Sequence, residues 1–178
     1  VYINVLSRQI STDTLTGLNN RRQLNRYLDL KINSAEANDN TFLMMLDADG
    51  FKSINDVFGH AAGDRALISI ADVLKKSCAH KDCFLARLGG DEFVIVGDEE
   101  SDFRPASLVE NIAAHVAEFN RQTREPFQLS ISAGWAYFQP GKVNTADALL
   151  MAADESMYVV KEGKRNRLPR SRHYRQHG

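Results

Sequence analysis

Residues 88–96 read LGGDEFVIV, which places two glycines and two carboxylates at the bend between two apolar runs. The runs Cys83–Ala86 and Phe93–Val96 have the composition of β-strands, and the short glycine-containing joint between them predicts a hairpin. Because Gly89 and Gly90 carry no side chain, another molecule can approach the backbone of the tip closely. The tip therefore offers bare backbone beside two hard oxygen ligands, with a solvated acidic turn as the alternative.

The composition describes one folded domain. The 178 residues suffice for a substantial core, and 43% hydrophobic with 25% charged residues is typical of globular proteins. The net charge of −1 provides no basic field, so we expect no nucleic-acid partner. No apolar run approaches the ~20 residues that span a membrane and no signal peptide is visible, so we expect no membrane contact from this domain. Cys78 and Cys83 lack metal-type spacing and fit core packing in a reducing cytoplasm, without a disulfide.

The two ends of the chain differ from its centre. Residues 1–10 begin with Val and are apolar, which we interpret as a linker or signalling-helix stub of a missing upstream domain; a remnant of the expression vector is the alternative. The catalytic domain is expected over residues 11–168, and the basic tail 169–178 is expected to be disordered. We expect a cytoplasmic location, although the full-length protein could be tethered to a membrane through its missing N-terminal part.

Before the hairpin, the pattern predicts a helix over Arg21–Ser34, capped by Asn19 or Asn20, and a strand over Thr41–Leu46. The helix has a stripe of Leu24, Leu28 and Ile32. The strand is continuously apolar, which is typical of a central strand buried on both faces. It ends in Asp47 and Asp49, where α/β sheets usually place ligands.

Five further segments complete the expected order. They are a helix over Phe51–Phe58, a loop over Gly59–Asp64 leading into a helix that ends near Cys78, an amphipathic helix over Arg104–Thr123, a strand over Phe127–Ala136 and a helix over Thr145–Lys161 stopped by Gly163. In the loop, His60 could be a ligand or proton carrier, but we favour a structural role. This order predicts one mixed α/β layer structure.

The carboxylates have chemical consequences if Asp47 lies beside Asp91 and Glu92. Each like-charge pair at ~4 Å costs ~4 kcal/mol at an effective dielectric constant near 20. Either one group stays protonated, or a hard cation such as Mg²⁺ binds and is shared with a phosphate substrate.

Basic residues complement these acids. Lys52 lies where a loop enters a helix, and Lys161, Lys164 and Arg165 add further cations, which together suggest a nucleoside-triphosphate site. No Walker-type motif is present, which excludes a P-loop enzyme. An Asp carboxylate beside an Asn amide can recognise a guanine edge, and Asn55 and Asp64 would form such a set if adjacent, although each is more typical of a cap or turn.

A known family is recognisable in these residues, because Gly89–Phe93 resembles the signature of the GGDEF family of diguanylate cyclases. The resemblance covers about residues 10–168 in the family's order, and the accompanying motifs are Asp13-x-Leu15-Thr16-Gly17-Leu18-x-Asn20-Arg21-Arg22, Asp47-x-Asp49-x-Phe51-Lys52-x-Ile54-Asn55-Asp56, Gly59-His60-x-x-Gly63-Asp64 and Tyr158-x-x-Lys161 with Arg165-Asn166. It implies an α/β (α+β sandwich) domain of the nucleotide-cyclase or polymerase-palm-like fold, with a central, mostly antiparallel five-stranded sheet flanked by helices. It also implies condensation of two GTP molecules to cyclic di-GMP and two pyrophosphates with Mg²⁺ or Mn²⁺.

The resemblance also assigns roles to residues of this chain. Metal ligands would be the side chains of Asp47 and Asp91, the carbonyl of Ala48 and, for a second metal, Glu92. Asp91 or Glu92 would take the proton from the attacking 3′-hydroxyl. Lys52, Lys161 and Arg165 would hold the triphosphate and stabilise the charge that develops on it. Asn55 and Asp64 would recognise guanine, and Gly90 would let the nucleotide approach the hairpin closely.

The family pattern further implies a homodimer, since one GTP per protomer must meet another, and control by an upstream sensory or regulatory domain. Three features of this chain bear on that pattern. Residues 80–83 read His-Lys-Asp-Cys where the family carries an Arg-x-x-Asp product-inhibition site, so we expect no inhibition there. The Lys-x-x-Gly spacing is shifted at Lys161-Glu162-Gly163, which leaves the role of Lys164 open, and Asp64 favours guanine.

Three alternatives stay open. A catalytically silent GTP-binding GGDEF module would signal to a partner domain, and a different palm-type nucleotidyl enzyme would differ in its use of ATP and GTP. The third is an α/β protein whose carboxylates merely cap turns.

Overall fold

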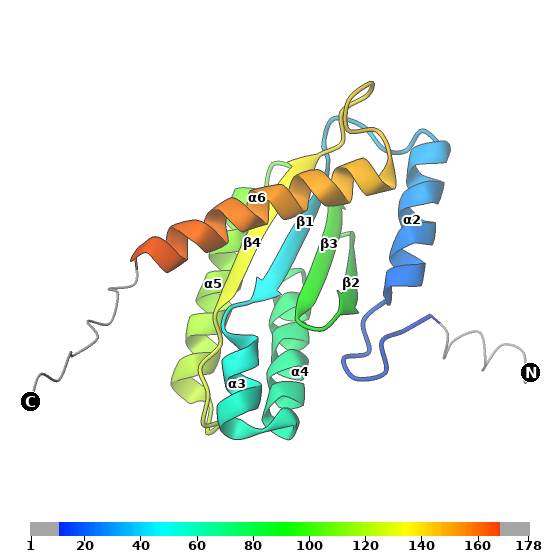
Figure 1. The fold of residues 1–178 in the computed structure, drawn as a ribbon. Helices are drawn as coiled ribbons and strands as arrows, with labels where there is room; N and C mark the ends of the chain where they lie inside the picture. Colours follow the sequence, from blue (N-terminus) through cyan, green and yellow to red (C-terminus); the bar gives the residue numbers. More distant parts are fainter. Residues whose placement is uncertain (1–10, 168–178) are drawn as a thin grey trace, which may run out of the picture.

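The structure is a computed structural model that describes residues 11–167 (Figure 1). A sheet of four antiparallel strands lies between two layers of helices. The elements in chain order are α2 (Arg21–Asn33), β1 (Thr41–Ala48), α3 (Phe51–Phe58), α4 (His60–Ser77), β2 (Cys83–Gly89), β3 (Glu92–Asp98), α5 (Pro105–Gln122), β4 (Ile131–Tyr137) and α6 (Ala146–Arg167).

The strands lie in the order β2-β3-β1-β4, so β1 is central, as its apolar run predicted. The five strands implied by the family resemblance are wrong for residues 11–167, where the sheet has four. Within residues 11–167, four segments are predicted as strands from the sequence, and each forms one strand. The α/β class, with an antiparallel sheet flanked by helices, is confirmed.

The strand β1 is buried along its whole length because its two sides face different helical layers. Phe42, Met44 and Leu46 pack with α4 and α5 on one face of the sheet. Leu43 and Met45 pack with α2 and α6 on the other face. Alternation of side chains along a strand thus converts an uninterrupted apolar run into two cores.

Three predicted boundaries were wrong, and the first two are the start of α4 and the start of the last strand. The segment expected to be a loop over Gly59–Asp64 is helical from His60, and only Gly59, with φ of 85°, separates α3 from α4. The last strand begins at Ile131 and not at Phe127. The Asn120 side chain accepts a hydrogen bond from the Leu129 N–H and donates one to the Leu129 carbonyl, both at 2.8 Å, so this backbone bonds to a side chain of α5 and not to a strand.

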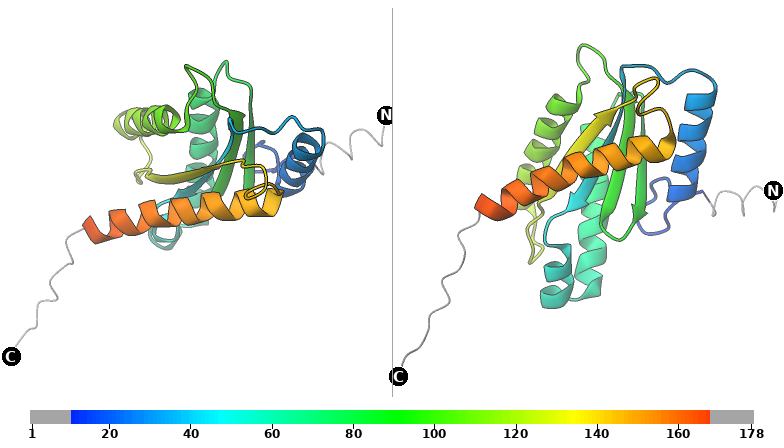
Figure 2. Two further views of the ribbon diagram at one scale, coloured as in Figure 1. Left: turned by 90° about the horizontal axis from the view of Figure 1, so that it is seen from above. Right: turned by 45° about the horizontal axis from the view of Figure 1, so that its top comes forward.

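The helix α6 runs past Gly163, where it was predicted to stop, and ends at Arg167. It crosses one face of the sheet and extends beyond β4 (Figure 2). The contact with β4 is so close that a Cβ atom on Gly134 would lie 2.0 Å from the backbone nitrogen of Met157. A glycine inside a helix costs only about 1 kcal/mol, so packing and ion pairs on both sides of Gly163 can override it.

The hairpin prediction is confirmed, since β2 and β3 pair as antiparallel neighbours. Both Gly89 (φ 133°) and Gly90 (φ 53°) have positive φ angles, which residues with a side chain rarely adopt. The turn lies at the end of the sheet where β1 ends and α3 begins (Figure 1).

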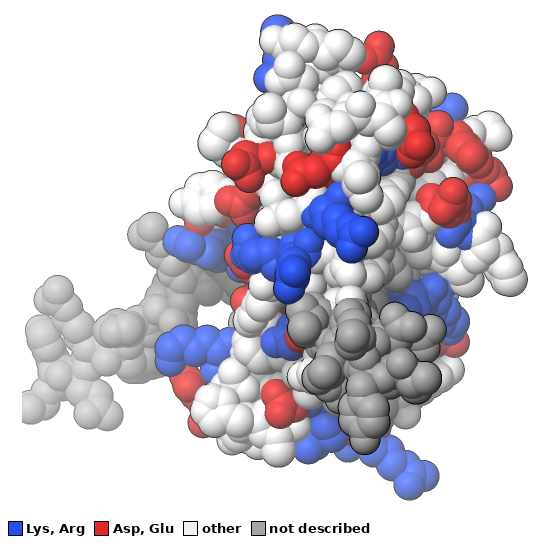
Figure 3. Space-filling view, turned by 90° about the vertical axis from the view of Figure 1, so that its right-hand side faces the viewer, with Lys and Arg blue, Asp and Glu red and all other residues white. Residues whose placement is uncertain are grey.

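The interpretations of residues 1–10 and of the tail 169–178 fall outside the described residues. Within residues 11–167, no helix has the length and apolar content to cross a membrane. The face that carries α2 shows both signs of charge, with acidic side chains gathered above a band of basic ones (Figure 3).

Candidate active site at the hairpin end of the sheet

The hairpin brings the predicted carboxylates to the end of β1. Asp47 lies directly opposite Glu92 in the register of β1 and β3. One residue further on, the N–H of Ala48 donates a 3.2 Å hydrogen bond to the carbonyl of Asp91. The expectation that the β1 end lies beside the hairpin tip is therefore confirmed.

A lysine from α6 partly compensates this negative charge. The Lys161 Nζ atom lies 2.5 Å from Asp47 Oδ1, and the Asp47 side chain is 11% exposed. Burial raises the pKa of Asp47, and the charges of Asp91 and Asp49 raise it further, against the opposing effect of Lys161. Burial opposes charge on Lys161 too, but its hydrogen bond to Asp47 and the surrounding carboxylates raise its pKa. One ammonium group does not neutralise the cluster.

The neighbouring Asp49 has a different environment. Its two carboxylate oxygens accept hydrogen bonds from the hydroxyls of Ser130 (2.7 Å) and Ser132 (2.6 Å), and Lys164 Nζ lies 2.8 Å away. Burial alone would raise the pKa of Asp49, but the hydrogen bonds from Lys164 and the two serines hold it below the usual value. Asp49 thus joins the end of β1, the start of β4 and the last turns of α6.

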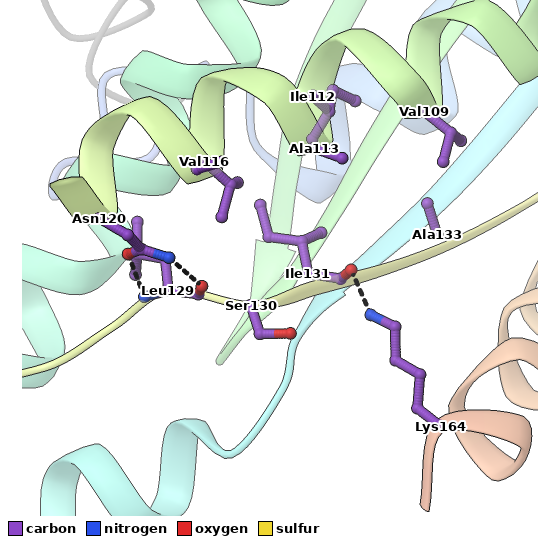
Figure 4. Close-up of a pocket in the computed structure, with 11 residues that line it drawn as sticks. Val109, Ile112, Ala113, Val116, Asn120, Leu129, Ser130, Ile131, Ala133 and Lys164 are labelled. Carbon is purple, nitrogen blue, oxygen red and sulfur yellow. Dashed lines mark hydrogen bonds between the residues drawn. The ribbon is translucent and has the colours of Figure 1, made fainter. Parts of the chain in front are cut away.

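Lys164 also donates a 2.7 Å hydrogen bond to the carbonyl of Ile131, beside a cavity of about 250 Å³ between α5 and β4 (Figure 4). The cavity walls are apolar side chains of α5 and β4, with Asn120, Ser130 and Lys164 as the polar lining residues. Because a triphosphate needs several cations, this cavity does not suit it.

The hairpin tip is tied to the start of the domain by Arg87. Its guanidinium donates two hydrogen bonds to the Gly90 carbonyl, at 3.0 and 2.8 Å, and two to the Asp13 carboxylate, at 2.9 and 3.1 Å. Asp13 in turn accepts from the N–H and the hydroxyl of Thr16. The conformation of the tip is therefore fixed by residues 74 positions apart in sequence.

The structure places one proposed guanine-reading residue, Asn55, beside the residue that precedes the other, Asp64. Asn55 lies on α3 and Asp64 on α4, and a Cβ atom at the intervening Gly63 would come within 1.9 Å of Asn55 Oδ1. Gly63 therefore leaves the space that the Asn55 side chain occupies beside the first turn of α4.

Two predicted phosphate ligands lie at the surface with other partners. Lys52 Nζ is 2.6 Å from Asp56, with the Lys52 side chain 87% exposed. Arg165 pairs with Glu162 at 2.8 Å. Surface pairs of this kind are worth at most about 1 kcal/mol, so both side chains can exchange these partners for a phosphate.

The donor set at this end of the sheet suits a hard divalent cation. Asp47, Asp91 and Glu92 offer carboxylate oxygens and Ala48 a carbonyl oxygen, the ligand types that Mg²⁺ and Mn²⁺ prefer. As the side chains stand, residues 11–167 contain no group of three or more His, Cys, Asp or Glu side chains placed to hold a metal ion. The donors fit the metal in type, but one oxygen of Asp47 is engaged by Lys161.

The sequence profile described as "Diguanylate cyclase, GGDEF domain" matches residues 10–167. The chain belongs to the GGDEF domain family. In solved structures, the coiled coil and GGDEF domain of DgcB from Caulobacter crescentus in complex with c-di-GMP is similar, with a TM-score of 0.77 and 29% identity over 93% of this chain and 88% of that chain.

Among curated relatives, this GGDEF domain is 36% identical over 155 residues to MucR of Pseudomonas aeruginosa, a bifunctional diguanylate cyclase/cyclic di-GMP phosphodiesterase, covering 86% of this chain and 22% of MucR. It is 35% identical over 162 residues to the cyclic di-GMP phosphodiesterase PdeR of Escherichia coli, covering 87% of this chain and 23% of PdeR. The chain thus spans less than a quarter of the length of these relatives.

Sequence reasoning about the site omitted several residues that the structure places there. Ser130 and Ser132 are two apart in the predicted strand Phe127–Ala136 and would share one face of it, a signal that could have been connected with the acids at the β1 end. The contact between Arg87 and Asp13 has no local signal. The sequence identified Lys164 as a cation. Its contact with Asp49 could not be predicted, because it depends on α6 continuing past Gly163.

Proposed function

We propose that this GGDEF domain is a diguanylate cyclase that condenses two GTP molecules into cyclic di-GMP and two pyrophosphates. The observation that carries the proposal is the meeting of Asp47, Asp91 and Glu92 at the β1 end, with Lys161 bound to Asp47. The negative charge at this site exceeds the positive charge, so a divalent cation would be stabilised there. That cation would be shared with the phosphates of a bound triphosphate.

In the proposed mechanism, Asp91 or Glu92 accepts the proton of the attacking 3′-hydroxyl, as a positioned general base. Lys161 leaves Asp47 for the triphosphate, where Lys52 and Arg165 join it and stabilise the charge that develops on the leaving pyrophosphate. Asp47, Asp91, Glu92 and the Ala48 carbonyl would hold Mg²⁺ or Mn²⁺. A bound metal would supply charge neutralisation and a more reactive 3′-oxygen.

The guanine base of GTP is proposed to lie beside α3 and α4. The Asp64 carboxylate can accept hydrogen bonds from guanine, and the Asn55 amide can pair with the remaining edge of the base. Gly90 would let the nucleotide approach the hairpin backbone closely. This arrangement predicts that GTP is used in preference to ATP.

Catalysis is proposed to need a homodimer, because each domain would hold one GTP and the two must face each other. An upstream sensory or regulatory domain would set the dimer geometry, in the cytoplasm or from a membrane. Because His80 and Cys83 occupy the ends of the window where the family pattern has Arg and Asp, product inhibition through that window is not expected.

The test is cyclic di-GMP formation from GTP and Mg²⁺ by this domain fused to a constitutive dimeric coiled coil. The matched control is the same fusion with Asp91→Ala. Product from the parent and none from the variant would support the cyclase and place its chemistry at the hairpin. No product from either fusion, with GTP binding intact by calorimetry, would overturn the enzyme proposal.

A second candidate is a catalytically silent GTP-binding module. Two observations favour it: the relative PdeR is described as a phosphodiesterase, and Lys161 and Lys164 already pair with the carboxylates at the β1 end. Such a module would bind GTP with 1:1 stoichiometry and yield no pyrophosphate, whereas the cyclase releases pyrophosphate at the rate of GTP loss. A different palm-type nucleotidyl enzyme would be revealed by turnover of ATP.

A further inference from the structure

Two thiols stand at the two ends of the turn that connects α4 to β2. Cys78 directly follows the last residue of α4, and Cys83 is the first residue of β2. The turn is closed by a 3.1 Å hydrogen bond from the Lys81 N–H to the Cys78 carbonyl. Both cysteines are free in this structure. The fold therefore brings together two thiols for which the sequence suggested only core packing.

The two cysteine side chains lie in the same core layer. Both side chains belong to the core layer between the sheet and α4, where Cys78 is 5% exposed and Cys83 is half-buried. The influence of Cys83 raises the pKa of the Cys78 thiol, and burial raises it further. The influence of Cys78 lowers the pKa of the Cys83 thiol, although burial and the charge of Asp82 act in the opposite direction. Cys83 is the more exposed of the two thiols.

The segments on both sides of the turn are held in place. The Asn111 side chain of α5 donates a 3.1 Å hydrogen bond to the carbonyl of Ser77, next to Cys78. Nearer to Cys83, Lys81 pairs with Asp102 at 2.5 Å and lies 5.9 Å from the centre of the Phe103 ring. Since folding has already ordered these segments, joining the two thiols would cost little further conformational entropy.

We propose that Cys78 and Cys83 form a reversible intramolecular disulfide, so that this turn is an oxidation site remote from the hairpin. The oxidant would be a hydroperoxide, and hydrogen peroxide is the simplest case. The Cys83 thiolate attacks one peroxide oxygen, which gives Cys83 sulfenic acid and hydroxide. The Cys78 sulfur then attacks the Cys83 sulfur, the S–O bond breaks, and the Cys78 proton and the leaving hydroxide give water.

The sum of the two steps is two thiols and one hydrogen peroxide converted to one disulfide and two waters. Two electrons pass from sulfur to oxygen, and a small thiol can return them by exchange. The order of attack follows from exposure, because the buried Cys78 cannot meet the peroxide first. In a reducing compartment such a disulfide would be transient, as sensing disulfides are. The proposal does not depend on cyclase activity.

The test uses the whole reduced chain treated with hydrogen peroxide, followed by denaturation, alkylation and peptide mapping. Trypsin cuts after Lys76, Lys81 and Arg87, so a disulfide would join the peptides 77–81 and 82–87. We expect both thiols to be lost to alkylation, the joined peptide to appear, and dithiothreitol to restore both. Cys78→Ser should instead give a dimedone-trapped sulfenic acid on Cys83, whereas Cys83→Ser should leave Cys78 unmodified while the chain is folded.

Three results would overturn the proposal. They are two thiols still open to alkylation after the oxidant, oxidation of Cys83 with Cys78 left free, and disulfides that join separate chains. The peptide map of the unmutated chain decides the matter even where a serine variant does not fold, as checked by circular dichroism.

Discussion

The central strand β1 has a lysine–aspartate pair at each end, and the two pairs are built in opposite ways. At the start of β1, Lys31 pairs with Asp98 at 2.8 Å, and the lysine side chain is 10% exposed while the aspartate is 44% exposed. At the hairpin end, Lys161 pairs with Asp47 at 2.5 Å, but there the lysine is 33% exposed and the aspartate 11%. In one pair the cation is enclosed, and in the other the carboxylate is.

The difference separates a structural pair from an exchangeable one. The Lys31 side chain is enclosed and cannot turn toward another partner. Its partner Asp98 also accepts a 2.6 Å hydrogen bond from the Thr41 hydroxyl. The more exposed Lys161 can turn toward water or a phosphate. The Asp47 carboxylate is too enclosed to reach water and would then need another cation to balance its charge. Further carboxylates at the hairpin end strengthen that demand.

The largest effect is expected from Asp47→Asn. The variant keeps the shape of the side chain but removes the charge, so the proposed cyclase activity should fall on the order of 10²–10³-fold. Stability should change by less than about 1 kcal/mol, because the buried carboxylate is itself disfavoured there. The measurements are cyclic di-GMP formation by the coiled-coil fusion and urea unfolding. Asp98→Asn is the matched control, and comparable activity losses in both variants would break the comparison.

The next effect is expected from Lys31→Met at the other end of β1. Methionine keeps the apolar stem but leaves Asp98 with Thr41 alone, which should lower the free energy of unfolding by about 1–2 kcal/mol and leave activity unchanged. Burial opposes charge on Lys31, but the hydrogen bond to Asp98 raises its pKa. The stabilisation is therefore complete below the unfolded value of 10.5 and is lost as pH rises through the higher folded pKa. Urea titrations at several alkaline pH values would check this, and an unchanged difference between the proteins across that range would contradict it.

A smaller effect is expected from Arg87→Lys, which tests whether the hairpin end needs its tether. A lysine keeps the positive charge but cannot reproduce the paired hydrogen bonds to Gly90 and Asp13, so stability should fall by about 0.5–1 kcal/mol and activity about threefold. The control is Arg65→Lys, which removes a similar two-bond contact with Glu125 at the surface. If the control loses as much activity as Arg87→Lys, the tether has no special role.

The smallest effect concerns the titration of two neighbouring acids. The pKa of Asp47 is raised and that of Asp49 is lowered from the usual 3.8. Asp49 therefore adds stability above pH 3.8 that is lost as pH falls through its lower folded pKa, whereas Asp47 has the opposite sign and favours folding when protonated. Side-chain carboxyl NMR should show Asp47 titrating at the higher pH. Coincident titrations would mean that the two environments are alike.

Much of the fold could be predicted because its signals are local. Asn20 caps α2 by accepting a 3.0 Å hydrogen bond from the Gln23 N–H, and the apolar run of β1 is central as expected. The end of α6 could not be predicted, because Gly163 is a local stop signal that contacts with distant residues override. The strand count came from resemblance alone and was one too high.

The candidate site was predictable in its acids and less so in what holds them. Asp47 and Glu92 adjoin strand ends with clear patterns, so their meeting followed from the hairpin. The seryl contacts of Asp49 and the tether of Arg87 join residues more than 70 positions apart, and no local pattern encodes such pairs. The roles assigned to Lys52, Asn55, Asp64 and Arg165 stay predictions.

The contact between Gly134 and α6 has a consequence for mutational scanning. Any side chain at this position meets the backbone of Met157, and backbone cannot rotate away as a side chain does. A substitution there would displace the helix that carries Lys161 and Lys164, although Gly134 itself touches none of the proposed substrate groups. A selection for activity would consequently score this glycine of the edge strand among the least tolerant positions, and a map of such scores would mark as catalytic a residue whose contribution is the absence of one carbon atom.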